Sequence, residues 1–121
     1  MLSLGSICYS IIRPLQSYNI CGHLWKASGN RLHLNEWRKR FFILYDQQLQ
    51  YYNNENNLEK LKYSLHCKDI ISVNYQKNDF HGRKAIKILH SKGIWYLSFE
   101  ENLLDEIKEK WMRVLQNNCK K

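Results

Sequence analysis

The sequence predicts a mainly β domain with one helix: a seven-stranded antiparallel barrel or sandwich, capped by a C-terminal amphipathic α-helix. Seven short runs rich in large apolar residues follow one another, each bounded by polar or glycine-containing turns. These runs span residues 21–27, 37–45, 49–52, 60–66, 69–75, 84–90 and 94–99. After the last run the apolar residues recur at helical spacing instead. At 121 residues, the chain has the length of one domain.

The final segment has the pattern of an amphipathic helix of about four turns. Its apolar stripe consists of Leu103, Leu104, Ile107, Trp111 and Leu115. Asn102 with Asp105, or Ser98 with Glu101, is the expected N-terminal cap. Acidic residues crowd the first turns, as the helix dipole favours. We expect Trp111 to close one open end of the barrel.

The chain is strongly basic for its size. It has 19 Lys and Arg against 11 Asp and Glu, a net charge of +8 and an isoelectric point near 9.4. The charges are also segregated, because residues 1–40 contain a single acid, Glu36, whereas acids dominate residues 100–109. An anionic partner is therefore expected, and phosphorylated lipid, a membrane surface and nucleic acid all satisfy this condition. A basic surface that only keeps the chain soluble is the alternative.

Residues 1–18 form a separable apolar arm in which Pro14 interrupts any helix. The arm lacks the basic start and the cleavage site of a signal peptide, and no apolar run in the chain is long enough to span a membrane. We therefore expect three parts: the arm at 1–18, the domain at 19–118 and a basic tail at 119–121. Cys8 is the candidate for acylation, whereas the glycine of the arm, Gly5, is not at the position that myristoylation requires.

The stretch EWRKRFFIL at 36–44 places three cations directly before the apolar part of one predicted strand. Alternate residues of a strand share a face, so Arg38 and Arg40 point the same way as Phe42. If Phe42 faces the interior, both guanidinium groups lie at the mouth of the barrel, and Lys26 reaches the same rim from the preceding strand. Convergent cations repel one another unless an anion compensates, and a guanidinium binds phosphate oxygens in pairs. The sequence therefore predicts a phosphate site.

Three features together resemble the pleckstrin homology (PH) domain family: GHLWK at 22–26, WRKRFFIL at 37–44, and a C-terminal helix with a central Trp111. The resemblance covers residues 20–117. It implies the seven-stranded, helix-capped fold and a module that is recruited to membranes by anionic phosphate headgroups. Phosphoinositide and phosphatidic acid both remain open, because one branch of PH proteins pairs an acylated N-terminus with phosphatidic acid binding.

The resemblance also implies roles for individual residues. Lys26 and Arg40 would hold the headgroup phosphates. Arg38 would add a contact, and Tyr51 would donate a hydrogen bond from its hydroxyl, unless it serves for packing only. The other residues implied lie in or beside the loop between the first two strands: Arg31 and His33 for the headgroup, and Leu32, Leu34 and Lys39 for membrane contact. Local packing is the alternative for the two leucines.

No catalytic pattern is present in the sequence. It contains no readable nucleophile–base set, no P-loop and no dinucleotide fingerprint. The histidines are scattered, and the cysteines form no CxxC pair, so we expect free thiols, no metal and no cofactor. We therefore expect a binding module rather than an enzyme.

Two other classes of function are compatible with a small basic β domain. A protein-interaction module would grip a peptide along an exposed strand edge and would be insensitive to the rim cations. A nucleic-acid-binding barrel would stack bases on Tyr51 and Tyr52 and would show steep salt dependence, but the helix with Trp111 and the strand number fit it poorly. We expect a cytoplasmic monomer that associates peripherally with membranes through an anionic lipid.

Overall fold

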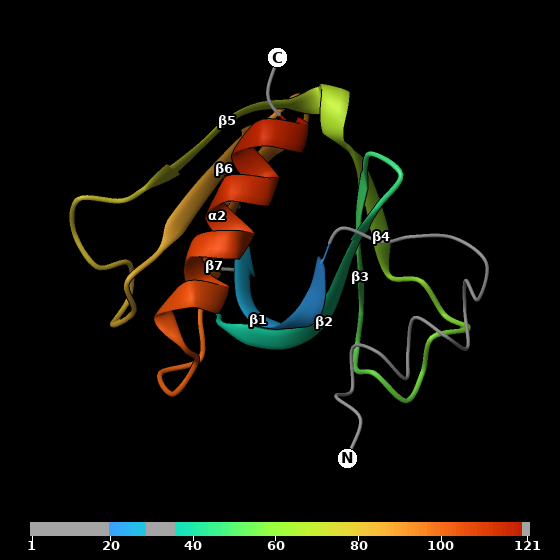
Figure 1. Cartoon of the computed structure of the whole chain (residues 1–121), viewed down its shortest axis with the longest axis horizontal. Coiled ribbons are helices and arrows are strands. Elements are labelled where there is room, and N and C mark those ends of the chain that lie inside the picture. The colour runs from blue at the N-terminus through green and yellow to red at the C-terminus, as the bar shows by residue number, and fades with distance from the viewer. Residues whose placement is uncertain (1–19, 29–35, 120–121) are drawn as a thin grey trace.

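The chain forms one curved sheet, with a helix lying across one open end (Figure 1). The computed structural model describes residues 20–28 and 36–119. The elements are β1 (Ile20–Ser28), β2 (Arg38–Tyr45), β3 (Gln48–Tyr52), β4 (Tyr63–His66), the 3-10 turn η2 (Cys67–Asp69), β5 (Ile70–Tyr75), β6 (Ile86–His90), β7 (Gly93–Ser98) and α2 (Asp105–Cys119).

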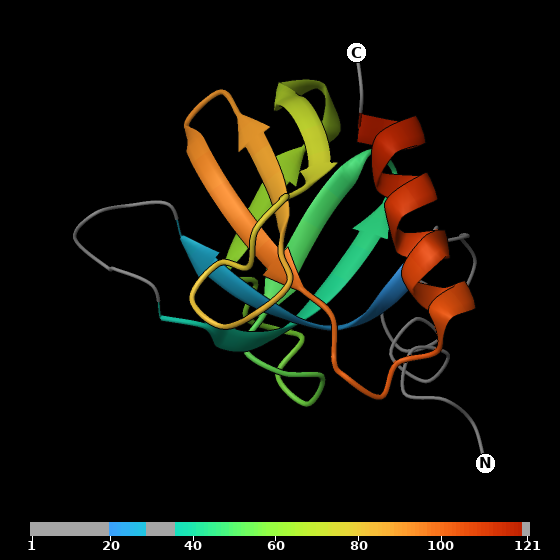
Figure 2. The same cartoon turned by 90° about the vertical axis from the view of Figure 1, so that its left-hand side faces the viewer.

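All seven described strands belong to one antiparallel sheet, in the order β4-β3-β2-β1-β7-β6-β5. Strand β1 serves both halves of this sheet, because residues 20–26 pair with β2 and residues 25–28 pair with β7. The sheet curves at this strand, so that its two halves surround a common interior (Figure 2). The predicted fold class, seven antiparallel strands and a C-terminal helix, is confirmed.

Apolar side chains from both halves of the sheet and from α2 fill the interior. The helix lies next to β5 and η2, and Gln116 Nε2 donates a hydrogen bond to the carbonyl oxygen of Val73 at 2.9 Å. Trp111 is 1% exposed, and Leu115 is fully buried in the same cluster as Phe42 and Trp95 of the sheet. Trp111 therefore closes the open end, as the sequence predicts.

The prediction that Leu104 and Ile107 belong to the buried stripe of the helix is wrong. The helix begins only at Asp105, and Leu104 and Ile107 are 60% and 37% exposed. The buried face comes from the second half of the helix, where Trp111 and Leu115 enter the core. Over the described part of the chain, no helix has the length and apolar composition that a bilayer span requires.

Neither predicted helix cap is correct. The carbonyl oxygen of Leu104 accepts hydrogen bonds from the backbone N–H groups of Ile107 and Lys108, so Leu104, and not Asn102, is the N-cap residue of the helix that begins at Asp105. Ser98 belongs to β7, and its hydroxyl donates to the carbonyl oxygen of Lys84 at 2.8 Å. This hydrogen bond satisfies a buried hydroxyl and removes Ser98 from any capping role.

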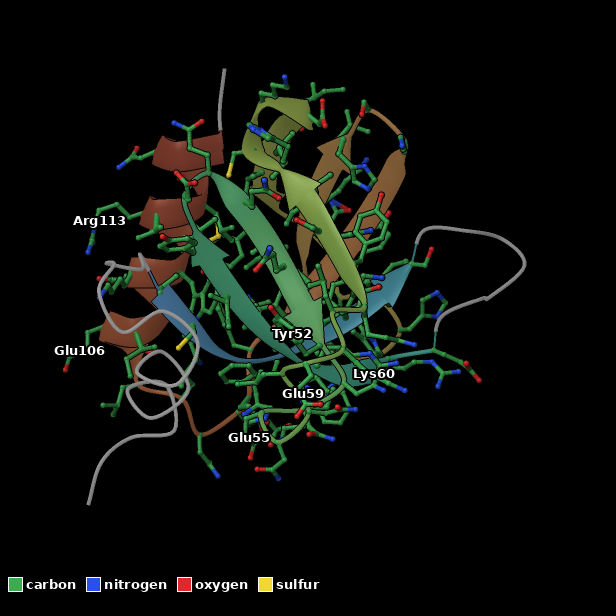
Figure 3. All side chains as sticks on the ribbon, turned by 90° about the vertical axis from the view of Figure 1, so that its right-hand side faces the viewer. Tyr52, Glu55, Glu59, Lys60, Glu106 and Arg113 are labelled. Atoms are coloured by element: carbon green, nitrogen blue, oxygen red, sulfur yellow. The ribbon has the colours of Figure 1, made fainter. Side chains whose placement is uncertain are left out.

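Both faces of β2 are buried from Phe41 to Leu44. Phe41 and Ile43 point away from the interior and form a second apolar cluster, against which Leu58 packs from the loop between β3 and β4. Glu55 belongs to the same loop, and its Oε1 lies 2.6 Å from Nε2 of His23 on β1. Figure 3 shows this loop, with Glu55 labelled, along the edge of the strands. Because residues 53–62 form the loop, the strand predicted at 60–66 begins only at Tyr63.

The turn between β2 and β3 contains a strained residue. Tyr45 pairs with Gln48, and both intervening residues have positive φ, 51° at Asp46 and 61° at Gln47. This two-residue turn favours glycine at its second position. We expect Gln47→Gly to raise the free energy of unfolding by about 0.5–1 kcal/mol in urea denaturation. Gln47→Ala removes the same side chain but keeps a Cβ, so the strain of the positive φ remains. An equal gain in stability from alanine would therefore contradict this explanation.

Candidate anion-binding site

Strand pairing brings the predicted cations to one end of the sheet. Lys26 of β1 lies directly opposite Arg38 of β2, and Arg40 lies opposite Leu24. This end of β1 and β2 is remote from α2 (Figure 2). Arg38 and Arg40 share a strand face with Phe42, which is fully buried in the interior, so both arginines lie at the mouth of the sheet.

The cations line a cavity of about 180 Å³. Its lining residues are Lys26, Ser28, Glu36, Arg38, Arg40 and Tyr51. Three cations face one carboxylate in a concave, partly apolar setting, which concentrates positive potential. The cavity is therefore suited to a small anionic group such as a phosphate.

The Lys26 ammonium lies against aromatic rings. Its Nζ is 5.1 Å from the centre of the Tyr51 ring and 4.9 Å from that of the Trp95 ring, within range of a cation–π interaction. Burial and, secondarily, the charge of Arg40 lower the pKa of the Lys26 ammonium to about 8. An anion in the cavity would offset the charge of Arg40, whereas burial, the larger cause of the lowered pKa, would remain.

Tyr51 is both a packing residue and a hydrogen-bond donor. Burial raises the pKa of its phenol, and the charge of Arg40 only partly opposes this shift. The hydroxyl therefore keeps its proton at neutral pH and can donate to a phosphate oxygen. The ring packs among three others, with centre-to-centre distances of 5.2 Å to Phe42, 6.2 Å to Tyr63 and 5.5 Å to Trp95.

The two arginines differ in exposure and partners. Arg38 is exposed and pairs through Nη2 with Glu36 Oε1, also at the rim. Arg40 is half-buried, and its Nη1 donates to the backbone carbonyl oxygen of Lys39 at 3.1 Å. A guanidinium has five N–H donors, so both arginines retain donors for a ligand. Exposed ion pairs contribute little free energy, so Glu36 competes only weakly with an incoming anion.

A second cavity, of about 420 Å³, adjoins the first and shares Ser28 and Tyr51 with it. Its other lining residues are Tyr63, His90, Lys92, Gly93, Ile94 and Trp95. His90 is only 6% exposed, and its Nδ1 accepts a hydrogen bond from the backbone N–H of Lys92 at 3.2 Å. The ring proton is therefore on Nε2, which, among the described side chains, is buried without a hydrogen-bond partner. Burial, followed by the charge of Lys26, lowers the pKa of the His90 imidazole.

The structure brings together four of the predicted site residues: Lys26, Arg38, Arg40 and Tyr51. It places Lys39 on the opposite face of β2, where Lys39 Nζ pairs with Glu100 Oε2 at 2.6 Å. The remaining predicted residues, Cys8, Arg31, Leu32, His33 and Leu34, lie outside the described residues.

Sequence reasoning missed the aromatic and imidazole side of the site. Tyr63 lies directly opposite Tyr51 in the β3–β4 register, a pairing that an aromatic residue at the start of a strand could have suggested. Trp95 lies opposite Ser28 in the β1–β7 register, and His90 ends the neighbouring strand β6. No local pattern signals these two contacts. Among the described residues, no group of three or more His, Cys, Asp or Glu side chains could hold a metal ion.

Several solved structures share this fold. The PH domain of human pleckstrin homology domain-containing protein family A member 5 has a TM-score of 0.69 at 24% identity, over 88% of this chain and 80% of that one. The C-terminal PH domain of pleckstrin in complex with D-myo-Ins(1,2,3,5,6)P5 has a TM-score of 0.65 at 19% identity, over 86% and 97%. The PH domain of human oxysterol binding protein-related protein 11 has a TM-score of 0.63 at 21% identity, over 87% and 82%. At these identities the likeness establishes the fold alone.

Sequence comparison extends the likeness to a family. The Drosophila melanogaster protein "Uncharacterized protein CG43867" is 26% identical over 106 residues, which cover 87% of this chain but 5% of that protein. The chain therefore spans only a small part of the length of this curated relative. The family model of the PH domain matches residues 18–120, from before β1 to beyond α2. With the fold, the strand order and this match in agreement, the chain belongs to the PH domain family.

Proposed function

We propose that this PH domain binds phosphorylated lipid headgroups at its cationic cavity and is thereby recruited to membranes. PH domains often bind lipids or proteins and are generally non-catalytic modules. One observation carries the proposal: Lys26, Arg38 and Arg40 converge on a single cavity with the protonated hydroxyl of Tyr51. Guanidinium groups bind phosphate oxygens in pairs, and an ammonium and a phenol hydroxyl add a charge and a further donor.

Each residue has a distinct part in this proposal. The forked guanidinium groups of Arg38 and Arg40 would each donate paired hydrogen bonds to phosphate oxygens. Lys26 would contribute a point charge, and Tyr51 would donate from its hydroxyl. A phosphoinositide and phosphatidic acid both carry the required phosphate. The inositol pentakisphosphate complex of the pleckstrin C-terminal PH domain supports the first of these classes.

Charge alone gives modest membrane affinity. Each Lys or Arg near an anionic leaflet contributes about 1 kcal/mol, and salt screens this attraction. Stable residence therefore needs a second contribution. The proposed sources are headgroup contacts from Arg31 and His33, membrane contact by Leu32 and Leu34 together with Lys39, and acylation of Cys8. The protein would then be a cytoplasmic monomer that associates peripherally with membranes.

Vesicle binding tests this function. Neutral vesicles would be compared with vesicles doped with phosphatidic acid, phosphatidylserine or single phosphoinositides, at low and physiological salt. We expect selective binding to one phosphorylated lipid. Arg40→Ala is expected to weaken that binding by about 10- to 100-fold, because charge-assisted hydrogen bonds are lost.

A matched control separates the site from overall charge. Lys110 is exposed on α2, away from the cavity, so Lys110→Ala removes one positive charge without touching the site. We expect this variant to bind within about twofold of the wild type at physiological salt, where the Debye length is about 8 Å. Equal losses in the two variants, or no vesicle binding by the wild type, would refute headgroup recognition at the cavity.

One observation supports a protein-interaction module as the second candidate. Strand β5 is an edge of the sheet, and Ile71 and Tyr75 on it are 60% and 50% exposed. An edge strand of this kind can pair with an extended peptide. In that case, substitution of Lys26 and Arg40 would leave binding to the partner intact.

A further inference from the structure

Among the lysines that the structure describes, Lys26 is unusual in what surrounds its amine. The groups that surround it are Arg38 and Arg40 of β2, Glu36 before them, Tyr51 of β3, His90 of β6 and Trp95 of β7. None of the ion pairs found among the described residues includes Lys26, because Glu36 pairs with Arg38. The amine therefore lies against aromatic rings and close to other positively charged groups.

This setting changes the chemistry of the amine. With a pKa of about 8, roughly a fifth of the Lys26 side chains carry a neutral amine at pH 7.4. An exposed lysine carries about one neutral amine in a thousand at that pH. A neutral amine is a nucleophile, and desolvation beside other cations is a known way to activate a lysine. Lys26 is thus the described lysine best placed to react covalently near neutral pH.

Two adjoining cavities determine which electrophile fits. Lys26, Arg38 and Arg40 line the cationic cavity, which suits a phosphate. The rings of Tyr51 and Trp95, against which the Lys26 amine lies, line the larger cavity of about 420 Å³, which has room for a planar ring. The unpartnered Nε2–H of His90 supplies one buried donor there. A small molecule that carries a phosphate can therefore place a carbonyl group beside the Lys26 amine.

We propose that Lys26 is a covalent modification site for phosphate-bearing aldehydes, which condense with its amine while Arg38 and Arg40 bind the phosphate. The Lys26 nitrogen attacks the aldehyde carbon and forms a C–N bond. One proton of the neutral amine moves to the carbonyl oxygen as the C–N bond forms, and the second leaves the nitrogen as the C–O bond breaks. The oxygen therefore departs as water, and a C=N double bond results. Nothing is oxidised or reduced. The imine fills the cationic cavity, so it competes reversibly with lipid headgroups.

This inference rests on the proposed function for phosphate binding by the arginines, and adds a covalent step at the same site. Pyridoxal 5′-phosphate is the probe, and pyridoxal is its phosphate-free control. The full chain is incubated with each at pH 7.4, the imine is trapped with borohydride, and the labelled lysines are located by peptide mass spectrometry. With pyridoxal 5′-phosphate, we expect Lys26 to be labelled at least tenfold faster than Lys39 or Lys110. Pyridoxal reacts more slowly with every lysine, because its free hydroxyl closes on the aldehyde, so its rates are compared as ratios: with pyridoxal, we expect the rate at Lys26 relative to that at Lys110 to fall at least fivefold.

Arg38→Ala provides the matched variant. The charge of Arg40, rather than that of Arg38, contributes to the lowered pKa of Lys26, so this variant keeps the reactive amine and removes one phosphate contact. Because Arg38 is exposed, the variant is expected to fold. We expect the preference for pyridoxal 5′-phosphate over pyridoxal to shrink at least threefold. Labelling that follows surface exposure, or equal rates with both aldehydes, would overturn the inference.

The two proposals can fail separately. Selective labelling of Lys26 without vesicle binding would leave the covalent site standing and would reject membrane recruitment. Vesicle binding that depends on Arg40, without selective labelling of Lys26, would support membrane recruitment and reject the covalent site.

Discussion

Replacing Lys26 with methionine is expected to weaken anion binding and to stabilise the unliganded protein at the same time. The Lys26 side chain is half-buried beside Arg40, and because burial and that neighbouring charge lower the pKa of the ammonium, folding disfavours its charged form. Methionine keeps a similar unbranched stem and makes favourable contacts with aromatic rings such as Tyr51 and Trp95. We expect the free energy of unfolding at pH 7 to rise by about 2 kcal/mol, less than the pKa shift alone implies, because the cation–π contacts are lost.

The pH dependence identifies the cause of this gain. The unfolded chain holds the Lys26 proton up to its ordinary pKa of 10.5, whereas the folded chain releases it near 8. Between these values the unfolded state binds more protons, so this residue makes the wild type more stable as pH rises. The advantage of Lys26→Met should therefore shrink between pH 8 and 10 in urea denaturation. A variant less stable than the wild type at pH 7 would contradict the burial of an unpaired charge.

Trp111→Ala is expected to cost about 3–5 kcal/mol of unfolding free energy. The indole is 1% exposed and packs beside Gly22 of β1, where an added Cβ would lie 3.9 Å from the Trp111 ring. Its loss would leave a cavity at the end of the sheet that α2 closes. Since domains of this size have about 5–15 kcal/mol of stability in total, the variant should be close to unfolding at 37 °C.

Ile107→Ala is the matched control for this prediction. Ile107 lies one turn earlier on the same helix but is 37% exposed, so alanine there should change stability by less than about 1 kcal/mol. Figure 3 shows Glu106 and Arg113 on the outer side of the same helix, away from the sheet. Urea denaturation followed by circular dichroism measures both variants. Similar losses at the two positions would mean that helix propensity, rather than closure of the core, determines the effect.

Much of the fold could be predicted because it depends on local periodicity. Alternation along β2 placed Arg38 and Arg40 on the face of Phe42, and the structure has all three on that face. The positions of the strands and of Trp111 followed in the same way. The start of α2 could not be predicted in this way, because the spacing of apolar residues does not show where the packed part of the helix begins. Leu104 and Ile107 belong to the stripe but lie where no element covers them fully.

The surroundings of the candidate site could be predicted only in part. The hairpin of β1 and β2 brings Lys26 to Arg38 over a short separation in sequence, and pairing with β3 adds Tyr51. By contrast, Trp95 reaches Lys26 because β1 pairs with both β2 and β7, and the sheet curves at this strand. A contact across such a separation leaves no periodic signal.

By itself, the sequence determined the order of the strands and helix, and the face of β2 that Arg38, Arg40 and Phe42 share. These properties follow from spacing along the backbone, which is local. The tertiary structure alone decided that residues 53–62 cover the outer face of β2, and that the amine of Lys26 rests on aromatic rings with a lowered pKa. Burial and electrostatics depend on everything within a few ångströms, and most of those neighbours are distant in sequence.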